Sequence, residues 1–367
     1  MDKDMVFIGM DLGTFKTSVA SSTGAREVLY SAVGWPKDQV ARTLLGRDVV
    51  FGNEVVSQRL ALDVVRPFEK GALKYDSQAS AGLPAEKLAR HREAARLLVE
   101  HAVALTRPPE GAAVCGVIGA PSRASVLNKK VLLDAARSAF DAVMIVSEPF
   151  TIAYGMNRLH DTLVIDIGAG TVDLCPITGT FPKEEDQVTL PVGGDFIDEH
   201  FCNQLRKTYP TAQLSLNTIR EIKEKFGFVH DVNEKAVVTL PVAGKPTQFD
   251  VAVPLKAACR TIVEPIVQGL RELIARFDPE FQQRMQQNII LGGGGSQLRG
   301  LDRMIEEGLR EYGGAQVKRV GDAVFAGAVG ALKLAMAMPR DCWDKIQTAP
   351  SSQARRAQSR EPLAVAA

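Results

Sequence analysis

The sequence lacks an excess of either charge. Its 367 residues carry 44 Lys and Arg against 43 Asp and Glu, which gives a formal net charge of +1. Such a chain generates no global field that would recruit nucleic acid or an anionic membrane surface. We therefore expect no nucleic-acid partner, and the length suits two domains of ordinary size.

Paired cysteines and clustered histidines are also missing. The five cysteines are widely spaced and include no Cys-x-x-Cys pair; they are Cys115, Cys175, Cys202, Cys259 and Cys342. An odd, scattered set argues against a disulfide framework or a zinc site and is typical of a reducing cytoplasm. The five histidines show no metal-ligand spacing, so no metal beyond magnesium is implied.

No long uninterrupted apolar run is present. The most apolar stretch, residues 323–338, is interrupted by Lys333 and is too short to span a bilayer comfortably, so it predicts a buried helix. Residues 1–4 lead into the first predicted strand without a signal peptide or an amphipathic anchor. These features predict a cytoplasmic protein with no direct membrane anchor.

Two similar turns follow strand-like segments in the two halves of the chain. The first is Asp-Leu-Gly-Thr at residues 11–14, and the second is Asp-Ile-Gly-Ala-Gly-Thr-Val-Asp at residues 166–173. A strand that ends in a Gly/Thr turn directs backbone N–H groups and a hydroxyl toward one point, where a phosphate can bind. The aspartate that opens each turn is placed to hold Mg²⁺ through its water ligands.

A third segment, four glycines and a serine at residues 292–296, follows the strand-like residues 288–291. Consecutive glycines cost chain entropy and suit a place where the backbone approaches a flat ligand closely. Any one of the three segments alone reads best as a tight turn. Together they predict an ATP site built between two halves of one protein.

The order of these segments resembles that of the superfamily of actin, sugar-kinase and heat-shock-chaperone ATPases. Residues 219–228 resemble the adenosine-contacting helix of actin, and residues 147–155 resemble the first interdomain helix of bacterial actins. Residues 193–198 are similar to the Gly-Gly-Asp/Glu turn of the second half. The resemblance spans nearly the whole chain and implies an α/β, actin-like fold. That fold has two duplicated α/β domains, each with a smaller outer lobe, and a nucleotide cleft between them.

Four further segments are similar to the bacterial actins that form filaments along magnetosome chains. They are residues 34–38, 118–125, 146–150 and 185–190. This resemblance implies that the chain assembles with itself into a filament homopolymer in the cytoplasm. It also implies magnetosome-associated proteins as further partners.

Alternating strands and helices in both halves predict parallel pairing with right-handed crossovers. We expect a first domain at residues 1–155, with its outer lobe at about 34–87. The second domain is expected at residues 156–322, with its outer lobe at about 193–255.

The remaining segments give four smaller predictions. A C-terminal helix at residues 323–346 should return to the first domain, and the basic, polar residues 347–367 should form a disordered tail. The polar stretch 76–82 reads as a loop at the edge of the first lobe, a location suited to filament contacts. Helical spacing predicts one helix over residues 257–277.

Hydrolysis of a terminal phosphate requires a held Mg²⁺, neutralised oxygens and a water placed in line. Asp11 and Asp166 suit the metal and its water shell. Glu148 lies in the first turn of a predicted helix, where the helix dipole favours the ionised carboxylate. It either positions the attacking water, as the resemblance implies, or only caps that helix. Asp11, Asp166 and Glu148 form the predicted catalytic set.

Several predicted nucleotide contacts have alternative readings. Lys16 reaches a phosphate or is a solvated turn lysine, and Asp173 faces the same water or metal or caps its own turn. Lys223 and Glu224 read alone as solvated helix charges; the resemblance places the acid at the ribose and the lysine over the base. The predicted nucleotide-binding residues are Gly13, Thr14, Lys16, Gly168, Gly170, Thr171, Asp173, Gly193, Lys223, Glu224, Gly293, Gly294 and Gly295.

These features predict an ATP hydrolase that uses ATP, ADP and Mg²⁺ and polymerises into dynamic cytoskeletal filaments, which disassemble after hydrolysis. A chaperone-type ATPase would carry a large substrate domain after its nucleotide domain, whereas only a short tail follows the last predicted helix. A small-metabolite kinase would need a catalytic aspartate in a substrate cleft, and no aspartate here clearly matches that role. A monomeric, nucleotide-gated adaptor stays open as an alternative.

Overall fold

The computed structural model describes residues 4–69, 72–73, 85–122, 124–230 and 234–346. The chain divides into two compact units. Unit 1 comprises residues 1–120, 124–156 and 327–367, and unit 2 comprises residues 121–123 and 157–326. The loop predicted at 76–82 and the tail predicted at 347–367 lie outside the described residues.

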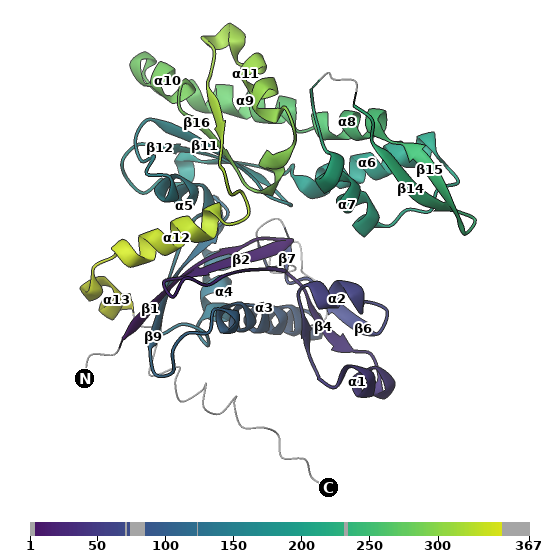
Figure 1. The fold of residues 1–367 in the computed structure, drawn as a ribbon. Coiled ribbons are helices and arrows are strands. Elements are labelled where there is room, and N and C mark those ends of the chain that lie inside the picture. The colour runs from purple at the N-terminus through teal and green to yellow at the C-terminus, as the bar shows by residue number, and fades with distance from the viewer. Residues whose placement is uncertain (1–3, 70–71, 74–84, 123, 231–233, 347–367) are drawn as a thin grey trace. The chain divides into compact units, whose positions relative to one another are not determined.

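Unit 1 is built on a five-stranded sheet with the order β10-β9-β1-β2-β3. Figure 1 labels β1, β2 and β9 of this sheet. Its strands are β1 (Met5–Leu12), β2 (Lys16–Ser21), β3 (Arg26–Tyr30), β9 (Ala113–Ala120) and β10 (Ala142–Ser147). β1 pairs antiparallel with β2 and parallel with β9, and β9 pairs parallel with β10. The carboxyl ends of β1, β9 and β10 therefore meet at one edge, which is where ligands of α/β sheets bind.

Unit 2 repeats this sheet. Its strands are β11 (Thr162–Ile167), β12 (Val172–Ile177), β13 (Val188–Leu190), β16 (Ile289–Gly292) and β17 (Val317–Arg319), in the order β13-β12-β11-β16-β17. β11 takes the place of β1, because it pairs antiparallel with β12 and parallel with β16, which pairs parallel with β17. The predicted structural duplication is confirmed.

Helices cover the sheet of unit 1. They are α3 (Ala85–Leu105), α4 (Val126–Ala136), α5 (Glu148–Gly155), α12 (Ala326–Ala337) and α13 (Arg340–Ile346). Figure 1 shows α3 and α12 on opposite sides of the sheet. A Cβ at Gly9 of β1 would lie 2.1 Å from the backbone of α12, so the helix rests directly on the strand. In the part of the chain that the structure describes, no helix has the length and apolar character needed to cross a bilayer.

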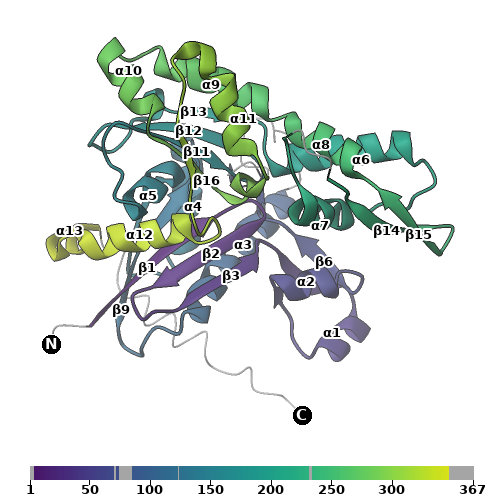
Figure 2. The same ribbon diagram turned by 45° about the horizontal axis from the view of Figure 1, so that its top comes forward.

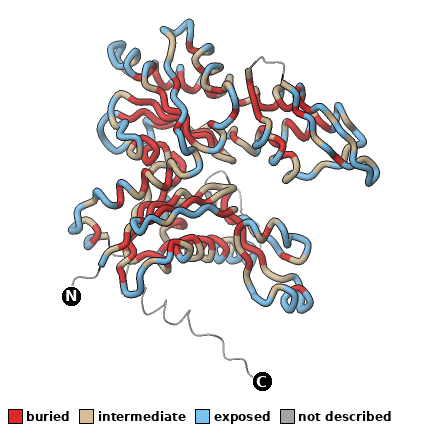
Figure 3. Tube along the Cα trace, viewed as in Figure 1, coloured by how far each residue is buried: buried red, intermediate tan, exposed pale blue. Residues whose placement is uncertain are grey.

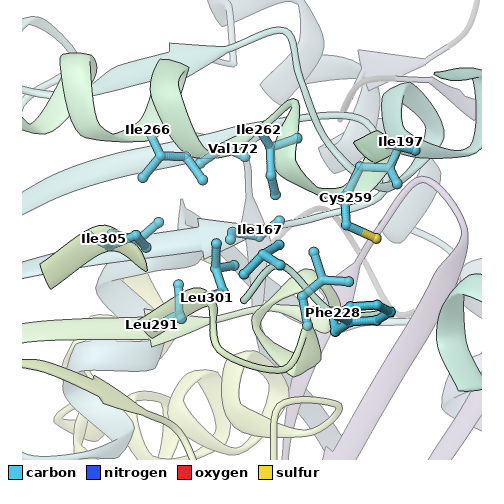
Figure 4. Packing of buried hydrophobic residues seen from close by; sticks show 14 of the residues in the cluster. Ile167, Val172, Ile197, Phe228, Cys259, Ile262, Ile266, Leu291, Leu301 and Ile305 are labelled. Carbon is cyan, nitrogen blue, oxygen red and sulfur yellow. The ribbon is translucent and has the colours of Figure 1, made fainter. Parts of the chain in front are cut away.

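The core of unit 2 lies between its sheet and the helices α9 (Val263–Ile274) and α11 (Leu301–Gly308). Figure 4 shows Ile167 and Leu291 of the sheet close to Ile266 of α9 and Ile305 of α11. All of these side chains are buried, and Figure 3 shows that buried residues follow the strands of each sheet. The unit also contains α10 (Pro279–Gln286) and the short 3₁₀ helices η2 (Glu184–Asp186), η3 (Gly294–Gln297) and η4 (Arg310–Tyr312).

Each unit carries a smaller substructure beside its main sheet. In unit 1 it contains β4 (Val33–Pro36), α1 (Gln39–Leu45), β5 (Val50–Phe51), α2 (Asn53–Ser57), β6 (Leu62–Val65), β7 (Phe68–Glu69) and β8 (Ala72–Leu73). In unit 2 it contains α6 (Gly194–Thr208), α7 (Leu216–Phe226), β14 (Val237–Val242), β15 (Lys245–Asp250) and α8 (Ala252–Arg260). Figure 2 shows the hairpin β14–β15 beside these three helices.

Two helices that the sequence predicts as single are divided in the structure, so both predictions were wrong. The segment 257–277 is split between α8 and α9, because Pro265 has no N–H and its ring would clash with the carbonyl of Thr261 in a continuous helix. The segment 323–346 is split between α12 and α13 at Pro339, since a proline disfavours helical backbone at the residue before it.

Candidate functional site

Asp11 and Glu148 lie at the same edge of the unit 1 sheet. Asp11 pairs with Gly119 of β9, and Gly119 pairs in turn with Val146 of β10, just before Glu148 begins α5. A Cβ at Gly119 would lie 3.0 Å from Cγ of Glu148. Gly119 therefore separates the two predicted catalytic acids, and its missing side chain leaves room for Glu148.

The carboxylate of Asp11 is packed against the first turn of α12. A Cβ at Gly327 would lie 2.6 Å from Oδ2 of Asp11, so a larger residue would displace the acid. Burial raises the pKa of Asp11 to about 6. A divalent cation would oppose this shift, because an adjacent positive charge favours the ionised form. The sequence analysis missed Gly327, whose only signal is a glycine in the first turn of an apolar helix.

Lys16 opens β2, next to the first predicted phosphate turn. Its Nζ lies 5.8 Å from the ring centroid of Phe15 and 5.9 Å from that of Tyr30. The two rings are 4.7 Å apart in an edge-to-face arrangement. The ammonium thus lies within cation–π distance of both rings, and contact with a phosphate stays a prediction.

Asp166 of unit 2 occupies the position that Asp11 has in unit 1. It pairs with Gly292 of β16, so the glycine-rich turn begins beside its carboxylate. Gly293 has a φ of +72°, and a Cβ there would lie 2.3 Å from Oδ1 of Asp166. Only glycine fits this position, both for its left-handed backbone and for its contact with the acid.

The next two glycines of the turn differ from each other. A Cβ at Gly295 would lie 2.1 Å from Cγ2 of Ile167, whereas a Cβ at Gly294 would meet no atom within 4 Å. Gly294 is exposed. The fold therefore requires glycine at position 295 for packing. The space beside Gly294 is available to a ligand.

The second phosphate turn is held by the first turn of α6. The Gly168 N–H donates to the Thr171 carbonyl at 2.9 Å, and the Gly194 N–H donates to the Gly168 carbonyl at 3.0 Å. A Cβ at Gly193 would lie 2.8 Å from the carbonyl oxygen of Ala169. The structure thus places Gly193 against the phosphate turn. Gly170 is partly exposed and lies within the same turn.

Asp173 is a buried acid whose carboxylate holds local structure. Thr171 and Thr189 donate their hydroxyls to it, and the Ser122 N–H donates at 3.3 Å. Burial raises the pKa of Asp173, and these hydrogen bonds act in the opposite direction. The arrangement favours the turn-holding alternative for Asp173. The sequence analysis missed Ser122 and Thr189, which are close to Asp173 only in the folded chain.

Lys223 of α7 is bound to the start of α6. Its Nζ donates to the Gly194 carbonyl at 2.7 Å and lies 2.7 Å from Oδ1 of Asp198. Arg220 lies 3.2 Å from the other oxygen of Asp198. Burial raises the pKa of Asp198, while Lys223 and Arg220 lower it. Glu224 is exposed on the same helix. Asp198 and Arg220 lie in segments that the sequence singles out, but no role was predicted for either side chain. The adenosine roles of Lys223 and Glu224 stay predictions.

A model of the MreB/Mbl protein family matches residues 5–339. The chain belongs to the MreB/Mbl family. This match covers both units and confirms the predicted resemblance to bacterial actins.

Within the MreB/Mbl family, the chain is similar to proteins named MamK. The actin-like protein MamK of Paramagnetospirillum magneticum strain AMB-1 is 40% identical over 344 residues, which are 94% of this chain and 96% of MamK. A MamK double helical filament structure gives a TM-score of 0.86 at 40% identity, covering 92% of this chain and 100% of that chain. A non-polymerising MamK mutant bound to AMPPNP gives 0.70 at 40% identity, covering 91% and 100%. These similarities confirm the actin-like fold.

Proposed function

We propose that this protein is an ATPase that assembles with itself into filaments when ATP and Mg²⁺ are bound. One observation carries the proposal. Asp11 and Asp166 lie one residue before the ends of equivalent central strands in two sheets that share one strand order, and a Gly/Thr turn follows each acid. The MamK relatives, one solved as a filament and one bound to AMPPNP, support the assignment.

The residues present suit a nucleotide with a magnesium ion. Carboxylate oxygens are the ligands that Mg²⁺ prefers, and Asp11 and Asp166 would hold it, partly through water. When bound, the ion neutralises phosphate oxygens and withdraws charge from the bond that breaks. Gly327 lies against the carboxylate of Asp11, and Gly293 lies against the carboxylate of Asp166. Neither position leaves space for a side chain.

Eight of the other predicted residues divide into four roles. Thr14, Gly170 and the Thr171 N–H would donate hydrogen bonds to phosphate oxygens. Gly168, whose N–H donates to the Thr171 carbonyl, would instead shape the turn around the phosphate. Glu148 would orient the attacking water and accept its proton. Lys223, Glu224 and Gly294 would face the adenosine.

We further propose that the filament lies in the cytoplasm and positions magnetosomes or another intracellular structure. The basis is the similarity to MamK over most of both chains. Filament growth requires a heterologous contact, because a head-to-tail interface that does not close on itself propagates. Magnetosome-associated proteins are the partners expected at the filament surface.

Sedimentation and electron microscopy of the purified protein test the function together. At micromolar concentration, ATP with Mg²⁺ should produce filaments that pellet, while EDTA should abolish both the filaments and phosphate release. The pellet should shrink as ADP accumulates. If ATP binds but only monomers are seen across a range of salt and pH, the monomeric adaptor replaces this proposal.

Gly294 offers a substitution that affects the ligand and leaves the fold intact. Gly294→Ala should change the free energy of unfolding by less than about 0.5 kcal/mol, because its Cβ enters open space. It should raise the Kd for ATP at least about tenfold if the nucleotide approaches this backbone. Calorimetric titration with AMPPNP and thermal unfolding would measure the two effects.

The matched variant is Gly295→Ala. Its Cβ would collide with Ile167, so it should lower the free energy of unfolding by about 1–3 kcal/mol. Unchanged nucleotide affinity in a well-folded Gly294→Ala protein would remove Gly294 from the site.

A further inference from the structure

Ser31 makes one hydrogen bond to the first phosphate turn and one to the residue that follows it. It is buried where the chain leaves β3 for β4, with 1% of its surface exposed. Its N–H donates to the Phe15 carbonyl at 2.8 Å, and its hydroxyl donates to the Gly13 carbonyl at 2.7 Å. Ser31 is distant in sequence from the turn, so neither bond arises from the turn itself.

The direction of the adjoining hydrogen bond follows from proton counting. Thr17 Oγ1 lies 2.9 Å from Ser31 Oγ, and Thr17 is fully buried. A hydroxyl has one proton, and Ser31 uses its proton on the Gly13 carbonyl, which can only accept. Thr17 must therefore donate to Ser31. The result is a relay of two hydrogen bonds, in which Thr17 donates to Ser31 and Ser31 donates to Gly13.

This relay sets the orientation of the Thr14 amide. The peptide that joins Gly13 to Thr14 is planar and trans, so its C=O and N–H point in opposite directions. Because Ser31 fixes the Gly13 carbonyl, the Thr14 N–H is directed away from Ser31. Thr14 is a predicted phosphate ligand, and phosphate binding by backbone amides depends on their direction.

We propose that Ser31, supported by Thr17, is a positioning residue that orients the Thr14 amide for phosphate binding. The inference rests on the proposed function, because that function assigns phosphate binding to this turn. Ser31 touches the turn and not the ligand. It acts by reducing the number of orientations that the Gly13–Thr14 peptide can adopt before the nucleotide arrives.

The test compares four variants by titration with AMPPNP and Mg²⁺, at protein concentrations below those at which the wild type sediments. Ser31→Ala should raise the Kd about tenfold, and Thr17→Val should raise it about threefold, because it removes only the supporting donor. Thr17→Ser keeps the hydroxyl and should bind as the wild type does. Ser21→Ala is the control: Ser21 is buried at the other end of β2, and its hydroxyl accepts from Thr23.

Steady-state turnover gives a second readout that a purely structural role would not produce. Ser31→Ala should raise KM by a factor similar to its Kd and change kcat less. Its melting temperature without nucleotide should be close to that of Ser21→Ala. Wild-type affinity in folded Ser31→Ala would overturn the inference alone, and failure of the wild type to bind AMPPNP would overturn the proposed function as well. If Ser31→Ala does not fold, equal affinities for Thr17→Val and Thr17→Ser would overturn the inference.

Discussion

Replacing Glu148 with alanine should slow ATP hydrolysis by about 10²-fold or more and leave ATP binding close to that of the wild type. The reason is its position. Glu148 opens α5 directly after β10, at the sheet edge that also carries Asp11. Under the proposed function, a carboxylate there would orient and deprotonate water, a task that matters during the reaction and little for binding. Filaments of the variant should therefore form with ATP and persist.

Phosphate release, AMPPNP affinity and filament lifetime should be measured on the same preparation of Glu148→Ala. Glu148→Gln keeps the size of the side chain and should be nearly as slow, because the amide cannot take a proton. Asp134→Ala removes an exposed acid of α4 that pairs with Arg137 at 3.0 Å, and it should turn over normally. If Glu148 only caps α5, the alanine variant would melt earlier but hydrolyse ATP at the wild-type rate.

The positions of the two Gly/Thr turns could be predicted from sequence because each turn depends on neighbouring residues. Asp11 and Asp166 come at the end of apolar, strand-like segments, and the turn chemistry follows within a few residues. The repeated order of strands and helices then predicts that both acids lie at the carboxyl edges of similar sheets. The structure has this arrangement, with β1 and β11 in equivalent positions.

The support around each turn could not be predicted, because it comes from residues far away along the chain. Ser31 and Gly327 carry no motif of their own, and Asp198 lies in a recognised segment without a signal for its ion pairs. Gly327 matters because α12 returns to β1, and Asp198 matters because α7 places Lys223 beside α6. The sequence alone does not indicate which of these distant residues come into contact in the folded chain. The helix break before Pro265 was different, since the sequence alone contained the signal.

The short strands of the outer lobes are a third case. β5, β7 and β8 each have only two residues, too few for an alternating pattern to be recognised. Their existence depends on tertiary pairing, as when β4 pairs with both β5 and β6. The sequence therefore predicts an irregular region with short strands, but not the pairing that joins these strands into small sheets.

Asp166→Ala should abolish both turnover and polymerisation. We expect hydrolysis to fall by at least about 10²-fold, because the acid that would hold Mg²⁺ near the phosphates is lost. Asp166 also contacts Gly293, so alanine removes a packing partner as well as a charge. Asp166→Asn separates the two effects, since the amide keeps the shape and loses the charge. It should fold normally and still fail to hydrolyse ATP or form filaments.

The matched control lies at the other end of the same strand. Asp161 precedes β11 and forms an ion pair of 3.1 Å with Arg284, which contributes at most about 1 kcal/mol to stability. Its φ is +45°, a conformation that asparagine tolerates, so Asp161→Asn should fold and turn over as the wild type does. Phosphate release and sedimentation, each titrated with Mg²⁺, would compare the variants. Normal turnover by Asp166→Asn, or by the wild type in EDTA, would contradict the assignment of Asp166 to the metal, because a carboxylate that serves a cation cannot be replaced by a neutral amide without loss.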